Sequence, residues 1–258
     1  MRKHIDFLYQ KGSVYKAYNN NLLYHGCIPL NDDGSFMRIH LNNKYYSGKN
    51  YLDFVDKTIR QAYLGLYEQK NIDLMYYFWC GRYSPFSGRE FKTFERMFIE
   101  DTDTWIEPSD AYYKYCNDEK ICDMILEEFS LKTKRGHIIN GHVPVKVKEG
   151  ESPVKCDGKV IVIDGGFSKP YQKVTGIAGY TLIYNSYGLN LTAHEPFTSK
   201  ADAVARETDI VSNRVAVSYM SRRQLVGDTD TGHALKERIQ ELIQLLDAYR
   251  TGIIKEKK

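Results

Sequence analysis

The chain has 258 residues, enough for one large domain or two small ones with a substantial core. Its 36 basic and 33 acidic residues leave a net charge of only +3, so composition indicates no attraction to nucleic acid or membranes. No apolar run reaches the roughly 18 residues of a membrane-spanning helix, and the N-terminus lacks the apolar core of a signal peptide. We therefore expect a cytoplasmic globular protein. Its five scattered cysteines favour reduced thiols over a disulfide framework.

The first half of the chain begins with a short helix or turn. The apolar run in "NNLLYHG" then predicts a buried strand ending at His25, and Asp33-Gly34 indicates a turn in a loop or hairpin. From Tyr51 to about Gln69, apolar residues recur every three or four positions, which predicts an amphipathic helix. The segment "DLMYYFWCGRYSPFSGREF" is expected to be a strand-like aromatic run followed by a loop.

The second half continues with a predicted helix from about Ile121 to Lys134. The segment "GHIINGHVPVK" predicts a second strand followed by a loop, and "VKEGESPVKCDGK" is expected to be an exposed loop. A third buried strand, "VIVIDGGFS", closes on Asp164, and "TGIAGYTLIYNSYGLNLTAH" predicts a hairpin. The segment "SKADAVARETDIV" looks helical, and a last helix carries apolar residues at a 3.6-residue period, with Asp230 or Thr231 as its N-cap.

Three of these predicted strands end in polar residues next to glycine. His25, His142 and Asp164 each stand where a strand runs into a glycine-containing loop. Neutral imidazoles on rigid strands suit metal binding, and glycine lets the backbone come close to an ion or a phosphate. The alternative is that each is an ordinary polar residue hydrogen-bonded to a neighbouring loop. The pattern as a whole predicts a layered α/β domain with a site at the strand ends.

Longer stretches of the sequence carry a family resemblance. "LLYHGCIPL" resembles the His-Gly motif of the calcineurin-like metallophosphoesterases, and "INGHVPV" followed by "VIVIDGGF" resembles their Gly-His motif and the strand after it. "FWCGRYSPFSGREFKTFER", "NGHVPVKVKEGESPVKCDGKVIVIDGGFSKPYQ", "GIAGYTLIYNSYGLNL" and "DTDTGHALKERI" resemble the class 3 fructose-1,6-bisphosphatases of Gram-positive bacteria. This second resemblance covers essentially the whole chain.

The resemblance implies a metallophosphoesterase sandwich, truncated at its N-terminal side and followed by C-terminal helices. Residues 1–198 would be the C-terminal part of the catalytic domain, with an insert at about 31–135, and residues 199–258 a helical segment. The implied reaction is the Mn²⁺-dependent hydrolysis of fructose 1,6-bisphosphate to fructose 6-phosphate and phosphate in gluconeogenesis. In such a site two metal ions neutralise the phosphoryl oxygens during in-line attack by water.

The resemblance also implies roles for single residues. His25 and His142 match ligands of one metal, whereas Asp164 is expected to orient a loop or a ligand histidine from behind. Arg82 and Arg89 are candidate phosphate contacts, because a guanidinium group pairs with phosphoryl oxygens. Their alternative is two ordinary arginines of a surface loop.

The sequence departs from the superfamily in one respect. The motifs Asp-x-His, Gly-Asp-x-x-Asp-Arg-Gly and Gly-Asn-His-Glu, which supply the other metal ligands, the bridging aspartate and the leaving-group acid, do not occur in the chain. We therefore recognise no catalytic acid, and the chain matches only the C-terminal part of family members. The expectation is a fragment that is inactive alone and needs the missing N-terminal half or a homo-oligomer partner.

Two other functions stay open at this stage. The first alternative is a non-catalytic module that binds a sugar phosphate or complements a separate N-terminal half. The second is a phosphoesterase for another substrate, such as a nucleotide or a phosphoprotein. The long matches around "CGRYSPFSGR" and "KEGESPVKCDGK" favour the bisphosphatase over the latter.

Overall fold

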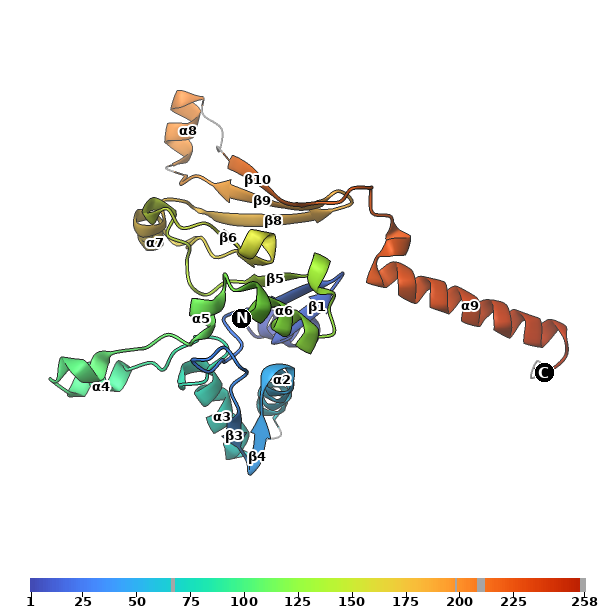
Figure 1. The fold of residues 1–258 in the computed structure, drawn as a ribbon, viewed down its shortest axis with the longest axis horizontal. Helices are drawn as coiled ribbons and strands as arrows, with labels where there is room; N and C mark the ends of the chain where they lie inside the picture. Colours follow the sequence, from blue (N-terminus) through green and yellow to red (C-terminus); the bar gives the residue numbers. More distant parts are fainter. Residues whose placement is uncertain (66–67, 198, 208–211, 256–258) are drawn as a thin grey trace. The chain divides into compact units, whose positions relative to one another are not determined.

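The computed structural model describes residues 1–65, 68–197, 199–207 and 212–255 (Figure 1). Its contacts divide the chain into two compact units. Unit 1 consists of residues 1–181 and 192–213, and unit 2 of residues 182–191 and 214–258. A five-stranded sheet forms the centre of unit 1, and a long helix, α9, belongs to unit 2.

The central sheet has the strand order β1-β2-β5-β7-β6. Its strands are β1 (Tyr15–Tyr18), β2 (Asn21–Tyr24), β5 (His137–Asn140), β6 (Val154–Lys155) and β7 (Val160–Val162). Strand β5 pairs in parallel with β2 on one side and β7 on the other, whereas the edge strands β1 and β6 pair antiparallel with their neighbours. The fold of unit 1 is therefore mixed α/β with a parallel centre.

The short apolar runs form strands because both faces of β5 and β7 are covered, and so is the face of β2 that carries Leu22. Leu22 in β2, Ile138 in β5 and Ile161 in β7 are fully buried. Continuous aliphatic runs of this kind are typical of parallel strands with no solvated face. All three predicted buried strands are thus confirmed, whereas β6 lies in the segment that we predicted to be only an exposed loop.

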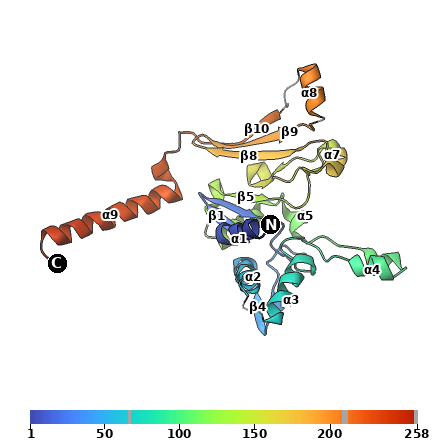
Figure 2. The same ribbon diagram turned by 180° about the vertical axis from the view of Figure 1, so that it is seen from behind.

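The chain between β2 and β5 carries a hairpin and most of the helices of unit 1. These are β3 (Ile39–Leu41), β4 (Lys44–Tyr46), α2 (Gly48–Tyr63), α3 (Gln69–Cys80), α4 (Thr93–Phe98), η1 (Thr102–Trp105), α5 (Tyr112–Tyr115), α6 (Glu119–Glu128) and η2 (Thr133–Arg135). The predicted turn at Gly34 exists, with its amide donating to the Asn31 carbonyl. At the N-terminus, α1 (Arg2–Lys11) packs on α2, where Tyr9 stacks on Tyr63 at 3.8 Å (Figure 2).

The predicted strand in the aromatic segment is wrong, because residues 73–80 belong to helix α3. Aromatic residues favour strands only where they pack on a pleated surface. Here Phe78 instead packs edge-on against Tyr51 and Phe54 of α2, so α2 and α3 form a helix pair. The helix expected to run to Gln69 ends at Tyr63, and residues 66–67 lie outside the described residues.

Helix α6 differs from its prediction at both ends. It begins at Glu119, where the Asp118 carboxylate accepts hydrogen bonds from the amides of Lys120 and Ile121. It ends at Glu128, six residues before the predicted end at Lys134, and Ser130 adopts a positive φ of 58°. A left-handed residue cannot continue an α-helix, so the chain turns into the approach to β5.

The last third of the chain contains η3 (Val147–Glu149), η4 (Cys156–Gly158), α7 (Lys169–Thr175), β8 (Gly179–Asn185), β9 (Gly188–His194), α8 (Lys200–Arg206), β10 (Ser212–Tyr219), η5 (Val226–Asp228) and α9 (Asp230–Arg250). Strands β8 and β9 form the predicted hairpin in a sheet of order β10-β9-β8. Ser199 caps α8 as its sequence indicates. The end of the segment that we predicted to be helical, residues 208–211, lies outside the described residues.

Helix α9 begins one or two residues before the expected start, because Thr229 and not Asp230 or Thr231 is its N-cap. The Thr229 hydroxyl accepts a hydrogen bond from the Gly232 amide at 3.1 Å. None of the helices in the described ranges is long and apolar enough to cross a membrane.

Candidate functional site

The three polar residues at the strand ends meet at one edge of the central sheet. His25 directly follows β2, while His142 and Asp164 come two residues after β5 and β7. Since these strands are parallel neighbours, their carboxyl ends lie side by side. Ligand sites of open α/β sheets form at this edge.

His25 and His142 are in direct contact although 117 positions separate them in the sequence. The Nε2 atom of His25 lies 3.1 Å from the Nδ1 atom of His142, and the ring centres are 5.0 Å apart. Below the rings, the Gly141 amide donates to the His25 carbonyl at 2.9 Å. His142 itself adopts a positive φ of 68°, a conformation uncommon outside glycine.

The surroundings favour neutral rings in both histidines. Desolvation lowers the pKa of His25, and the nearby Asp164 carboxylate opposes this only in part. Desolvation also lowers the pKa of His142, followed by the charges of His25 and Arg89, while Asp164 again opposes them. A neutral imidazole keeps a lone pair for a metal ion.

Asp164 is held by its own loop. Its Oδ1 atom accepts from the Gly166 amide at 2.9 Å, and its carbonyl accepts from the Val145 amide at 2.9 Å. A Cβ atom placed on Gly141 would lie 3.6 Å from the Asp164 Cβ atom, so the carboxylate stands beside the loop that bears His142.

A loop from Gly81 to Arg89 packs on the residues after β2. The Cys27 amide donates to the Pro85 carbonyl at 3.0 Å, and a Cβ atom on Gly26 would come within 2.5 Å of the Phe86 carbonyl oxygen. Only glycine fits at position 26, because a side chain there would displace the loop backbone. The Ser87 backbone of this loop also lies close enough to the His142 ring to act on its pKa, which it raises.

The two candidate arginines lie in different surroundings. Arg89 is half-buried and acts electrostatically on His142, and its Nε atom is buried without a hydrogen-bond partner in the described part of the chain. Arg82 is exposed, with its guanidinium group over the Tyr83 ring at 5.5 Å. Among the described residues, Arg89 and not Arg82 acts electrostatically on the histidine pair.

A buried polar network beneath the histidines was not predicted from the sequence. Tyr24 donates to the Tyr112 hydroxyl at 2.7 Å, and the Asn140 amide also donates to that hydroxyl at 2.7 Å and to the Gly26 carbonyl at 3.4 Å. The three side chains are at most 7% exposed. The network therefore ties the ends of β2 and β5 together. Asn140 could have been suspected from its place just before Gly141-His142, whereas no signal marks Tyr112.

The histidine pair fits a metal ion as two of its ligands. Two nitrogen ligands at about 2.1 Å from one ion are about 3.0 Å apart at a right angle and about 3.4 Å apart in a tetrahedron. The observed separation of 3.1 Å lies within that range. Within the described ranges, no group of three or more His, Cys, Asp or Glu side chains is placed to hold an ion. The pair alone thus supplies an incomplete coordination sphere.

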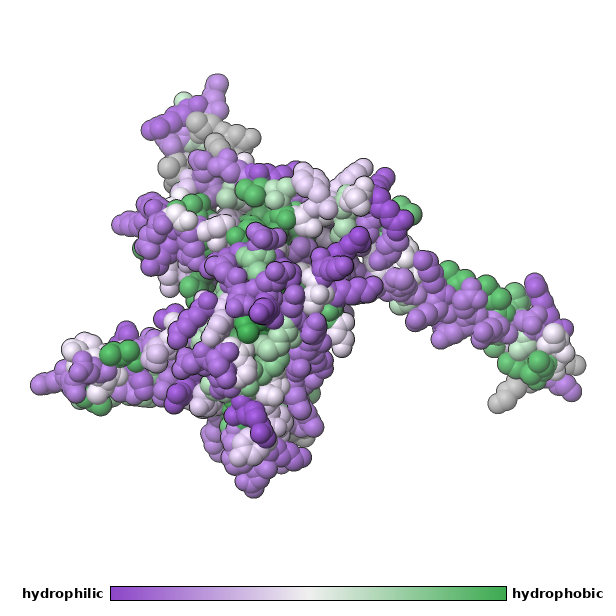
Figure 3. Space-filling model, in the orientation of Figure 1, coloured by the Kyte–Doolittle hydropathy of each residue, from purple (hydrophilic) through white to green (hydrophobic). Residues whose placement is uncertain are grey.

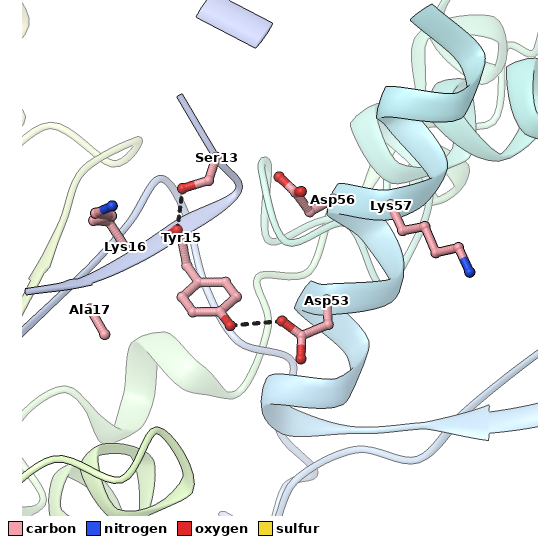
Figure 4. A pocket seen from close by; sticks show the side chains of 7 residues that line it. All are labelled: Ser13, Tyr15, Lys16, Ala17, Asp53, Asp56 and Lys57. Atoms are coloured by element: carbon pink, nitrogen blue, oxygen red, sulfur yellow. Dashed lines mark hydrogen bonds between the residues drawn. The ribbon is translucent and has the colours of Figure 1, made fainter. Parts of the chain in front are cut away.

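A hollow of about 440 Å³ lies elsewhere in unit 1, between β1 and α2 (Figure 4). Two lysines and two aspartates are among the seven residues that line it, which are Ser13, Tyr15, Lys16, Ala17, Asp53, Asp56 and Lys57. Both aspartates already have partners: Asp53 accepts from Tyr15 at 2.7 Å, and Asp56 accepts from the Val14 amide at 3.1 Å. These contacts secure β1 on α2 and leave no converging set of polar groups.

The fold and the strand-end geometry define a mixed α/β protein with a candidate metal site at the carboxyl edge of its parallel strands. The chain belongs to the Firmicute fructose-1,6-bisphosphatase family, whose sequence model matches residues 1–251.

Relatives of the chain carry the same family name. It is 52% identical to a protein named fructose-1,6-bisphosphatase class 3 from Clostridium botulinum (strain Loch Maree / Type A3), and 53% identical to one of the same name from Clostridium tetani (strain Massachusetts / E88). Each alignment covers 99% of this chain and 39% of the relative, so the chain spans well under half the length of these curated relatives. No solved structure matches the chain.

Proposed function

We propose that the chain forms part of a fructose-1,6-bisphosphatase, which hydrolyses fructose 1,6-bisphosphate to fructose 6-phosphate and phosphate. One observation carries the proposal: His25 and His142 come within 3.1 Å of each other at the carboxyl edge of the sheet, in a chain that belongs to this family. Identity above 50% with proteins of that name, over nearly the whole chain, supports the same reaction class.

In this proposal the two histidines are imidazole ligands of one Mn²⁺ ion. Their lowered pKa values keep the nitrogen lone pairs free near neutral pH, and the Gly141 amide fixes their backbones relative to each other. When bound, Mn²⁺ would supply Lewis-acid chemistry at the phosphoryl oxygens. Asp164 orients the loop of His142 and offsets positive charge there, as a carboxylate behind a ligand histidine does.

Arg89 is the arginine that we assign to the substrate phosphate. Its buried, unpartnered Nε–H group lies in the loop that contacts the His142 ring, where a phosphoryl oxygen could accept from it. A phosphate role for Arg82 stays a prediction, and its exposed position over Tyr83 gives it no special support.

The finer fold and domain assignments are part of the proposal. Parallel strands that end in His-Gly and Gly-His loops support a calcineurin-like metallophosphoesterase sandwich. We likewise propose residues 1–198 as the metallophosphoesterase part, with an insert at about 31–135. Residues 199–258 were expected to be helical, but there the strand β10 lies between the helices α8 and α9, so we propose them only as a separate C-terminal segment. Most of the insert is the helical connection between β2 and β5. A cytoplasmic location also stays a prediction.

The same chain alone is expected to hydrolyse little or no substrate. Two imidazoles leave the coordination sphere incomplete, and no third His, Cys, Asp or Glu side chain completes a metal site with them in the part of the chain that the structure describes. We propose that the remaining ligands, the bridging carboxylate and the leaving-group acid are supplied by a further segment or a second copy. The alternative is a non-catalytic module that binds a sugar phosphate or complements such a segment, which the incomplete ligand set equally supports.

Two measurements test the proposal. Mn²⁺ binding, followed by the loss of the free-ion electron paramagnetic resonance signal, should be weak in the native chain and lost in His25→Ala and His142→Ala. It should persist in the matched control His40→Ala, because His40 is exposed in the β3–β4 hairpin and rests on Tyr45. Unchanged binding in both site variants would contradict the assignment of the metal ligands.

Hydrolysis of fructose 1,6-bisphosphate with Mn²⁺ is then measured for the chain alone and mixed with a separately expressed remainder of a longer relative. Activity only in the mixture, lost on His25→Ala, would support the bisphosphatase. Mn²⁺ binding without activity in the mixture would favour the non-catalytic module. Activity of the chain alone would show that the native chain completes the site by itself.

A further inference from the structure

Helix α9 of unit 2 carries a regular apolar stripe. Leu235, Ile239, Leu242, Leu246 and Tyr249 follow one another in alternating steps of four and three residues. This seven-residue repeat is the spacing of a coiled-coil seam. Ile239 and Leu246 occupy one heptad position, a, and Leu235, Leu242 and Tyr249 occupy the other, d. Ile243 and Leu245 widen the stripe in the middle of the helix.

The stripe is exposed along its length. Its seven side chains, Leu235, Ile239, Leu242, Ile243, Leu245, Leu246 and Tyr249, are 44% to 53% exposed. Figure 3 shows hydrophobic residues gathered along α9. The 3-10 helix η5 packs only near the start of the helix, where Gly232 is buried under the Val226 carbonyl and Lys236 donates to the Gly227 carbonyl at 2.8 Å. Helices of soluble proteins normally cover a stripe of this size.

The charges of the helix argue for a protein surface and against a membrane. Between Asp230 and Arg250 the charged residues are four acids and three bases, namely Asp230, Glu237, Glu241 and Asp247 with Lys236, Arg238 and Arg250. A helix that lies on a membrane is typically rich in lysine and arginine on its polar face. A nearly neutral helix can instead approach a second copy of itself with little charge repulsion.

The area of the stripe is sufficient for a dimer. An aromatic side chain buries roughly 150–250 Å², and leucine and isoleucine lie near the lower bound, so seven half-exposed side chains offer up to about 600 Å² per helix. Two copies would bury about 1,200 Å² in total, which reaches the lower end of stable, specific interfaces. One of the two a positions is Ile239, and two of the three d positions are leucines, a combination that favours two-stranded coiled coils.

We infer that α9 is a dimerisation helix, whose stripe packs against the same stripe of a second copy of this chain as a two-stranded coiled coil. This inference does not depend on the proposed function, because none of the residues of the strand-end site takes part. It assigns unit 2 a role in assembly.

Sedimentation velocity of the full chain over a wide concentration range tests the inference. The native chain, of 29.9 kDa, should shift from monomer to dimer as its concentration rises. The double variant Leu242→Gln with Leu246→Gln should raise the dissociation constant at least about tenfold, because it removes apolar area from the centre of both stripes. Glutamine keeps a helix propensity close to that of leucine, so far-UV circular dichroism should stay unchanged.

The matched control is Leu8→Gln on α1, another leucine on an exposed helix face at 63% exposure, which should dimerise like the native chain. A native chain that stays monomeric at every concentration would overturn the inference, and some other surface would then cover the stripe. A dimer that persists unchanged in the α9 double variant would overturn it as well. If the double variant loses helix content, Leu242→Gln alone provides the same comparison with a milder change.

Discussion

Leu22 and Ile138 beneath the histidine site are fully buried, whereas Leu242 and Leu246 on α9 are each 49% exposed. Both pairs belong to regular apolar patterns in the sequence. In unit 1 the parallel pairing of β2, β5 and β7 brings His25 to His142, and the segments packed on the sheet bury its central apolar side chains. On α9 the pattern builds a helix with one open face. In both regions the local pattern predicts the correct kind of element, but only contacts with distant segments turn the element into a site.

The largest expected effect comes from removing one tyrosine in each region. Tyr112→Ala deletes a ring that is 2% exposed and the hydroxyl that joins Tyr24 to Asn140, and should lower the free energy of unfolding of unit 1 by about 3–5 kcal/mol. Tyr249→Ala on α9 removes a ring that is 44% exposed, and should cost less than about 1 kcal/mol at a dilution where the chain is monomeric.

Urea unfolding followed by far-UV circular dichroism measures both variants against the native chain. Tyr112→Phe serves as the control that keeps the ring and removes only the hydroxyl. Similar losses of unfolding free energy in Tyr112→Ala and Tyr249→Ala would contradict the expected difference between the buried network of unit 1 and the exposed stripe of α9.

An intermediate effect is expected at two glycines of the strand-end site. Gly26→Ala would place a methyl group 2.5 Å from the Phe86 carbonyl oxygen, so the loop must move at a cost of about 1–3 kcal/mol. Gly141→Ala would meet the Asp164 Cβ atom at 3.6 Å and the His25 carbonyl oxygen at 3.8 Å, which are ordinary contacts.

Comparing the two variants separates the effect of a steric clash at position 26 from the general effect of replacing a glycine by alanine. Gly26→Ala should show a lower thermal unfolding temperature and weaker Mn²⁺ binding, while Gly141→Ala should stay near the native chain in both. The reverse order would mean that the loop from Gly81 to Arg89 is not fixed on the residues after β2.

Several features of the site could be predicted from the sequence. The strands before His25 and His142 are short apolar runs with a glycine one or two residues after their ends, and those signals are local. The aromatic run from Asp73 to Cys80 was misread as a strand, because the packing of Phe78 on α2 decides its conformation. The periodicity of α9 revealed its stripe but not what covers it.

Other features depend on contacts between distant segments and leave no local trace. Tyr112 meets Tyr24 across 88 positions and Asn140 across 28, so no window of sequence contains the network. Arg82 and Arg89 lie in the same loop, and the sequence alone does not distinguish their roles. They differ only because the loop packs Arg89 inward beside His142 and leaves Arg82 exposed.

The smallest expected effect concerns a carboxylate at the edge of the buried network. Asp110 accepts hydrogen bonds from the amides of Tyr112 at 2.8 Å and Leu30 at 3.2 Å. Desolvation nevertheless raises its pKa above the usual value, although those two hydrogen bonds oppose the shift. Because the folded pKa is raised, the stability that Asp110 contributes is complete below the unfolded pKa and declines as pH rises through the folded pKa.

Asp110→Asn keeps an oxygen acceptor for both amides and removes the charge. The variant should match the native chain in acid and become more stable than it by up to about 1 kcal/mol near neutral pH. Urea unfolding at a series of pH values measures this difference, and the comparison in the same buffers cancels the titration of all other groups. A variant that loses stability relative to the native chain as pH rises would show that the two amide hydrogen bonds favour the ionised carboxylate more than burial disfavours it. An ionised carboxylate would then be stable at the edge of the network, whereas the Tyr112 hydroxyl at its centre has only the neutral partners Tyr24 and Asn140.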